Sequence, residues 1–162
     1  METPISQQTA RSMDGSWPHV TVAGLVLDPD HSKTIIIYRG ENVRSAKNRW
    51  AILTGLLEHG ESVDDALVRE AEEELGLHGC TVLPGYDGFY ENQSDGFHWV
   101  LVVRPVVHPS CFEGVRNMEP DKHDKIETIG LRALWTQIQY GQKTFDRHAD
   151  TFLTEYLPRF FK

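Results

Sequence analysis

The chain has 162 residues, 40% of them hydrophobic and 10% aromatic, and its formal net charge at pH 7 is −8. This composition is typical of a globular domain rather than a disordered chain, and the negative charge disfavours binding to a long nucleic acid. No apolar run approaches the roughly 20 residues that span a bilayer, so we expect no membrane-spanning helix. Residues 1–17 read as a tail or lead-in, and residues 18–162 as a single domain.

The first residues and the two cysteines bear on location. The opening stretch METPISQQTARSMDGSWPH is polar and lacks the apolar core of a signal peptide. Cys80 and Cys111 form no CxxC pair, which disfavours a structural zinc site, and a single disulfide is not needed at this size. We therefore expect a cytoplasmic protein with free thiols, and a homodimer is left open.

The first half of the domain begins with strands. His19–Leu27 and Thr34–Arg39 are apolar and β-branched, and the turn sequence DPDHSK separates them. A polar loop follows, and Arg49–Leu53 is a short extended segment that leads to Gly55. The chain therefore enters its most acidic stretch from a strand.

A helix is predicted directly after this segment. Ser62 is a suitable N-cap, with Asp65 three residues later, and Gly76 is a suitable C-cap. Apolar residues recur every four positions, as on one side of an amphipathic helix: Val63, Leu67, Ala71 and Leu75.

The second half contains further strands and one more helix. The predicted strands lie in the segments Thr81–Leu83, 85–92, Phe97–Val107 and Ile126–Leu131. The apolar spacing in Thr144–Leu157 predicts an amphipathic helix, which Pro158 should end or distort. Strands with one helix early and one late predict an α/β fold, an α/β/α sandwich with a mixed β-sheet.

The early helix concentrates negative charge on one side. Residues three and four apart share a helix face, so Glu70, Glu73 and Glu74 project together. Arg69 can pair with this row, and Glu61 can reach Arg69 if the loop folds back. Carboxylate oxygens of this kind suit Mg²⁺ or Mn²⁺. Taken alone, the pattern fits a solvated acidic helix at least as well.

The spacing of the segment is more specific than its charge. It reads Gly55, five residues, Glu61, seven residues, Arg69, Glu70, Ala71, one residue, Glu73, Glu74, one residue, Gly76 and Leu77. This is the complete Nudix signature, and the sequence resembles a Nudix hydrolase throughout it. The surrounding strands and the late helix also fit the Nudix-type sandwich. The later segment NMEPDKHDKIETIGLRAL (Asn117–Leu134) resembles, more loosely, MutT-like nucleoside triphosphate pyrophosphatases.

The resemblance implies an enzyme that cleaves a nucleoside diphosphate linked to a further group X, with Mg²⁺ as cofactor and Mn²⁺ as an alternative. The implied metal ligands are Glu70, Glu73, Glu74, the backbone carbonyl of Gly55 and Asp124, with Glu58 as a further candidate. An exposed loop aspartate is an equally good interpretation of Asp124. A bound divalent cation would offset the charge of the diphosphate and activate water.

The resemblance also implies roles in catalysis. Glu73 is the expected general base, and Glu61 and Arg69 are expected to fix the loop against the helix. One position departs from the family, because Thr54 stands where the usual Pro-Gly-Gly sequence has a glycine. If that position required a positive φ, threonine would be strained there and the nucleotide site would be reshaped.

The substrate is expected to be a small nucleotide, most simply a nucleoside triphosphate or a modified or deoxy form. The basic loop before the signature carries four candidate phosphate ligands: Arg39, Arg44, Lys47 and Arg49. An ordinary solvated loop explains them equally well. Phe97 and Trp99 are candidates for stacking on the base, although packing in the core is the simpler role for each.

The sequence leaves other substrates and another class of protein open. ADP-ribose, a nucleotide sugar or an RNA cap would be an alternative substrate for the same chemistry. A nucleotide-sensing module without catalysis is a different class, but such modules often lose carboxylates of the signature, and this chain keeps all of them.

Overall fold

An eight-stranded sheet forms the centre of the molecule in the computed structural model, which describes residues 19–43, 47–84, 88–94 and 97–161. The predicted tail, residues 1–17, lies outside these ranges. The strands are β1 (His19–Leu27), β2 (Lys33–Arg39), β3 (Trp50–Ala51), β4 (Leu53–Leu56), β5 (Thr81–Val82), β6 (Gly88–Ser94), β7 (Phe97–Val107) and β8 (His123–Gly130).

The sheet is mixed, as expected. Its central strand β1 runs parallel to β7 along its whole length and antiparallel to β2 and β4 on its other side. The strand order is β3-β2-β1-β7-β5, with β4 paired to β1, β6 to β7 and β8 to β2. Strand β4, which carries Gly55, therefore lies next to the central strand β1, whereas β8, which follows the late acidic segment, lies beyond β2.

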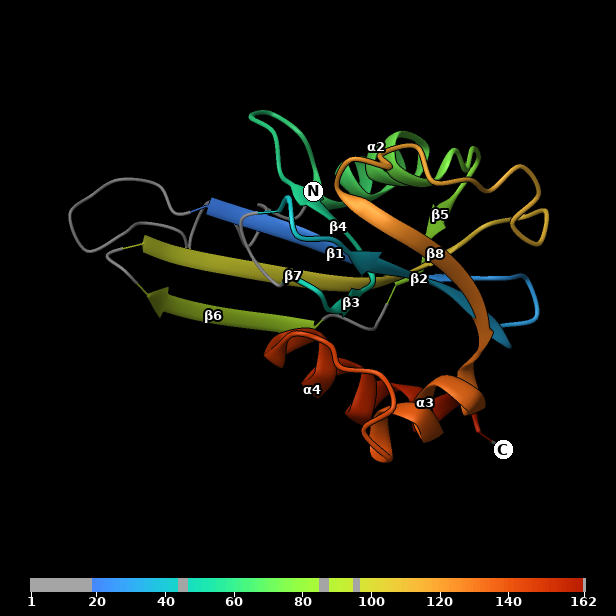
Figure 1. The fold of residues 1–162 in the computed structure, drawn as a ribbon. Helices are drawn as coiled ribbons and strands as arrows, with labels where there is room; N and C mark the ends of the chain where they lie inside the picture. Colours follow the sequence, from blue (N-terminus) through green and yellow to red (C-terminus); the bar gives the residue numbers. More distant parts are fainter. Residues whose placement is uncertain (1–18, 44–46, 85–87, 95–96, 162) are drawn as a thin grey trace.

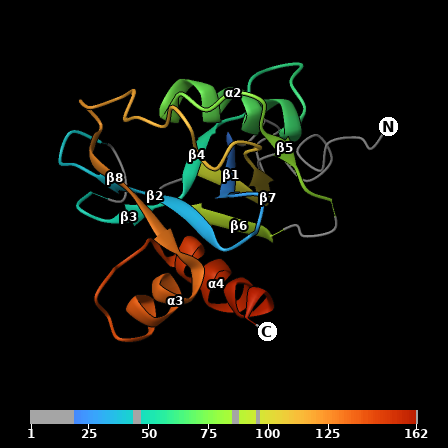
Figure 2. The ribbon, with the colours of Figure 1, turned by 90° about the vertical axis from the view of Figure 1, so that its right-hand side faces the viewer.

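Helices cover both faces of the sheet. Helix α2 (Val63–Leu75) lies on one face, and α3 (Leu131–Gln139), α4 (Arg147–Tyr156) and a short 3₁₀ helix (Leu157–Phe160) lie on the other (Figures 1 and 2). This arrangement confirms the predicted α/β/α sandwich. No helix within the described part of the chain is both long and apolar enough to cross a membrane.

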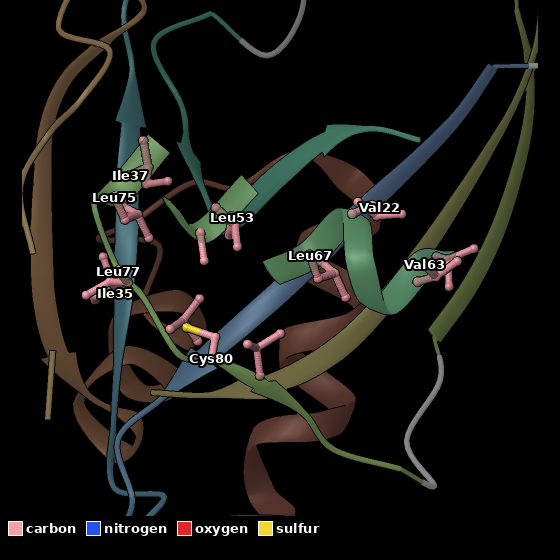
Figure 3. Packing of buried hydrophobic residues seen from close by; sticks show 14 of the residues in the cluster. Val22, Ile35, Ile37, Leu53, Val63, Leu67, Leu75, Leu77 and Cys80 are labelled. Atoms are coloured by element: carbon pink, nitrogen blue, oxygen red, sulfur yellow. The ribbon is translucent and has the colours of Figure 1, made fainter. Parts of the chain in front are cut away.

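Alternation along the strands divides the apolar core into two clusters. In β2, Ile35 and Ile37 face α2, whereas Ile36 between them faces α3 and α4. Figure 3 shows the first cluster, where Leu67 and Leu75 of α2 meet side chains of the sheet such as Val22. Because successive side chains of a strand point to opposite faces, one sheet supplies a separate core to each helical layer.

The caps of α2 are those that the sequence predicts. The Ser62 side chain accepts a hydrogen bond from the backbone N–H of Asp65, and Gly76 ends the helix at φ 65°. A left-handed residue at this position favours glycine because it has no Cβ. The predicted apolar stripe is buried along the helix, so local pattern and tertiary packing agree here.

The C-terminal part differs from the prediction in two respects. The late helix α4 is shorter than Thr144–Leu157, because Asp146 caps it by accepting from the backbone N–H groups of His148 and Ala149. Pro158 lies in the 3₁₀ helix that follows, as its effect on helices suggests. Helix α3 was not predicted, and Leu131, assigned to a strand, is instead its first residue.

Candidate active site

Arg69 joins the loop before α2 to the helix itself. Its Nε donates to Glu61 Oε2 at 2.7 Å and its Nη2 donates to Glu61 Oε1 at 3.0 Å, a two-point contact. The same Nη2 donates to the backbone carbonyl of Leu56 at 3.0 Å. Glu61 Oε1 also accepts from the backbone N–H of Glu58. The loop folds back as expected, and the hydrogen bond from Arg69 lowers the pKa of Glu61.

The other side of the guanidinium faces the helical carboxylates. Arg69 Nη1 donates to Glu70 Oε1 at 2.8 Å and to Glu73 Oε2 at 3.1 Å. The Glu70 side chain is buried, whereas that of Glu73 is 53% exposed. The row of carboxylates predicted for one face is therefore split between the interior and the solvent.

Glu74 is the most unusual carboxylate of the group. Its residue is only 8% exposed, and its Oε2 atom is buried without a hydrogen-bond partner. Burial, followed by the negative charges of Glu70 and Glu119, raises the pKa of Glu74 to about 8. Burial also raises the pKa of Glu70, and this outweighs its hydrogen bond with Arg69. Two neighbouring buried carboxylates are costly for a fold unless a cation or proton neutralises them.

These residues fit a hard divalent cation. The unpartnered Glu74 oxygen and the buried Glu70 carboxylate are the donor type that Mg²⁺ and Mn²⁺ prefer. Within the ranges that the structure describes, no three acidic, histidine or cysteine side chains already converge as a metal site. Arg69 instead holds Glu61, Glu70 and Glu73, so the carboxylates lie around its guanidinium.

Gly55 of β4 lies against the side chain of Glu70. A Cβ atom at this position would overlap the carboxyl group of Glu70, so the backbone of β4 can approach the helix only without a side chain. Neither Gly55 nor Thr54 has a positive φ. Position 54 therefore does not require a left-handed residue, and threonine is accommodated in the strand without that backbone strain. The metal role of the Gly55 carbonyl stays a prediction.

The segment after β7 adds a carboxylate, Glu119, that was not among the predicted metal ligands. Glu119 follows Met118, whose backbone N–H donates to Glu74 O at 3.1 Å, and the charge of Glu119 contributes to the raised pKa of both Glu70 and Glu74. Asp124, the late ligand suggested by the resemblance, is exposed, and its carboxylate would collide with a Cβ atom at Gly40. Its metal role stays a prediction. Glu119 could have been selected from the sequence, because Glu119–Lys122 stands in the position of the family's EPEK motif.

The basic residues of the preceding loop have different surroundings. Arg39, at the end of β2, acts electrostatically on Glu74 and so belongs near the carboxylates. Arg49 donates to the backbone carbonyl of Phe145, beside α4, and Lys47 is exposed. Arg44 lies outside the described residues.

The two aromatic candidates for base stacking are described by their backbone alone. Phe97 and Trp99 belong to β7, whose backbone is described, but their side chains lie outside the described part of the structure. Their stacking role stays a prediction.

The structure is thus an α/β/α sandwich whose acidic helix buries Glu74 and, against Gly55 of the sheet, Glu70. A sequence model described as the NUDIX domain matches residues 17–151. The chain therefore belongs to the Nudix family and is a Nudix pyrophosphohydrolase. Members of this family act on small nucleotides and generally use divalent metal ions.

Solved structures show the same fold. A MutT protein from Methanosarcina mazei Go1 is 20% identical, with a TM-score of 0.64 over 88% of this chain and 94% of that chain. A MutT NUDIX hydrolase from Burkholderia pseudomallei is 23% identical, with a TM-score of 0.60 over 86% and 98%. A Caenorhabditis elegans Ap4A hydrolase in a binary complex is 12% identical, with a TM-score of 0.61 over 88% and 94%. No curated protein matches the chain.

Proposed function

We propose that this protein hydrolyses a nucleoside triphosphate, in a standard, modified or deoxy form, to the monophosphate and pyrophosphate in a Mg²⁺-dependent reaction. The observation that carries the proposal is the buried pair Glu70 and Glu74, one of whose oxygens has no partner in the protein. An unneutralised pair of this kind costs stability, and cation binding would offset that cost.

The chain supplies distinct groups to such a reaction. Glu70 and Glu74 would hold the cation, with Glu119 beside them, and Mn²⁺ would fit the same oxygen donors. When bound, the ion would offset the charge of the diphosphate and make a nearby water more acidic. Glu73, whose side chain is half-exposed, is the candidate proton acceptor for that water. Arg69 and Glu61 orient the carboxylates and hold the loop in place.

Two further features support a nucleotide with several phosphates. Arg39 provides a positive charge close to Glu74, where a phosphate chain would need one. Two of the similar folds carry the name MutT, whereas a third is named as an Ap4A hydrolase. A dinucleoside polyphosphate is therefore the second substrate to test.

Product analysis in ¹⁸O-labelled water tests the proposal. The purified protein is incubated with Mg²⁺ and nucleoside triphosphates, dinucleoside polyphosphates, ADP-ribose, NADH, nucleotide sugars or capped nucleotides. The expected result is release of pyrophosphate and a nucleoside monophosphate, with no activity in a chelator. Inert triphosphates beside rapid hydrolysis of another substrate would overturn the substrate assignment. Binding without turnover would instead indicate a sensing module.

A further inference from the structure

The segment between β7 and β8 is attached to the end of α2 that carries the buried carboxylates. The backbone N–H of Arg116 donates to Leu75 O at 3.0 Å, and that of Met118 donates to Glu74 O at 3.1 Å. Figure 1 shows this segment passing beside α2 before it enters β8. Its position relative to Glu74 is therefore set by backbone hydrogen bonds.

A tight turn then fixes the main chain of Lys122. The backbone N–H groups of Lys122 and His123 both donate to Glu119 O at 3.0 Å, and Gly40 N–H donates to Lys122 O at 3.0 Å. Asn117 supports the turn, since its side chain donates to His123 O at 2.7 Å and accepts from Glu119 N–H at 3.2 Å. The residue is thus anchored at the junction of α2, β2 and β8.

The Lys122 side chain extends from this anchored backbone and is 63% exposed. Its ammonium pairs with Glu119 Oε2 at 3.0 Å. Glu119 directly follows Met118, whose backbone N–H is bound to the Glu74 carbonyl, so the ion pair lies close to the end of α2 that carries the buried pair. In agreement, Glu119 is the main cause that raises the pKa of Lys122, and the charges of Glu74 and Glu70 add to it. The lysine is therefore a positive charge held at the rim of the acidic site.

A site built from carboxylates needs positive groups to bind a polyphosphate. A lysine ammonium on a flexible stem is suited to following phosphate oxygens, because it donates in several directions. Its contact with Glu119 is an ion pair near the protein surface, and solvent or another ligand can easily replace such a contact. Resting on the function proposed above, we propose that Lys122 binds a phosphate group of the substrate and leaves Glu119 when the nucleotide enters.

The matched control is Lys125, three residues later. It carries the same charge on β8, but its ammonium lies over the rings of Tyr38 and Trp50, at 5.5 and 5.3 Å from their centres. Tyr38 and Trp50 pack with the cluster on the α3 and α4 side of the sheet, away from the carboxylates. Lys125→Ala therefore removes an equal charge from the other face.

The test compares Lys122→Ala, Lys122→Arg and Lys125→Ala in steady-state kinetics with the triphosphate that the wild-type protein hydrolyses. We expect Lys122→Ala to raise KM roughly tenfold, with a smaller change in kcat, because it removes one charged contact to phosphate. Lys122→Arg should recover most of the affinity. Equal KM values for Lys122→Ala and Lys125→Ala would overturn the proposal.

A binding measurement separates this proposal from the assigned reaction. Inorganic tripolyphosphate is titrated into each variant with Mg²⁺, and the shift in melting temperature is recorded. A shift that is lost only in Lys122→Ala supports the phosphate contact, even if wild-type protein does not hydrolyse triphosphates. An unchanged shift in Lys122→Ala contradicts it, whereas wild-type turnover alone decides the reaction.

Discussion

Helices α2 and α4 lie on opposite faces of one sheet and bury different kinds of residue. The buried residues of α4 are apolar or aromatic: Ala149, Phe152, Leu153 and Tyr156. Helix α2 buries an apolar stripe and, next to it, the carboxylates of Glu70 and Glu74. Both helices have the amphipathic pattern of a layer packed on a sheet, so the pattern alone does not distinguish them.

Burial has opposite effects on stability at the two helices. On the α4 face, burial removes apolar surface from water, which stabilises the fold. On the α2 face, part of the burial raises the pKa of two acids and leaves one oxygen unpartnered, which destabilises it. Perturbed groups of this kind gather at functional sites. Mutations on the two faces should therefore separate stability from activity.

Leu153→Ala should have the largest effect on stability. This side chain of α4 is fully buried, and its truncation leaves a cavity that costs about 2–5 kcal/mol. Urea unfolding should show a lower midpoint, while the remaining folded protein keeps its kcat. A comparable fall in kcat under conditions where the variant is fully folded would contradict the separation of the two faces.

Glu70→Gln and Glu74→Gln should have the opposite profile. Each removes a charged oxygen donor but keeps the shape, so turnover at saturating Mg²⁺ should fall on the order of 100-fold or more. Thermal unfolding without metal should show no loss of stability, because burial disfavours the ionised form of both acids and an amide carries no charge. Glu72→Gln is the control on the same helix, since Glu72 contacts only His78 among the ion pairs described. Near-normal turnover in either variant would refute the metal role.

Arg69→Ala should affect both properties to an intermediate extent. The arginine holds Glu61, Glu70 and Glu73 and the carbonyl of Leu56, so its loss leaves partly buried acids unpaired. We expect a loss of about 1–3 kcal/mol in stability and a fall in turnover of roughly tenfold. Melting temperature and kcat are measured together. If both were unchanged, Arg69 would be an ordinary surface residue.

The smallest expected effect is a pH dependence caused by Glu74. Its pKa in the folded protein, about 8, lies above the ordinary value of 4.5. The resulting stability is present below the ordinary value and is lost as pH rises through about 8. In a chelator, the melting temperature of wild-type protein should fall relative to that of Glu74→Gln as the pH rises from about 5 to about 8, and should change little further above it. Parallel curves would exclude this cause.

Local features were predicted well where they depend on neighbours in sequence. The stripe of α2 and its caps Ser62 and Gly76 follow from helix geometry, which acts over a few residues. The pairing of Arg69 with Glu61 was expected if the loop folded back, because Glu61 directly precedes the N-cap Ser62 and Arg69 lies within the first turns of the same helix. Helix α3 was missed although Leu131, Leu134 and Ile138 have helical spacing, since the preceding strand leads into it without a side-chain cap.

The sequence by itself determined the family, through the spacing of the acidic and basic residues from Gly55 to Leu77, and it determined the caps and apolar face of α2. Only the tertiary structure decided that Glu70 and Glu74 are buried while Glu73 is half-exposed, and that Glu119 and Lys122 join them from a distant segment. The reason is physical: helix spacing is a local property, whereas desolvation and charge interaction depend on everything that packs around a group.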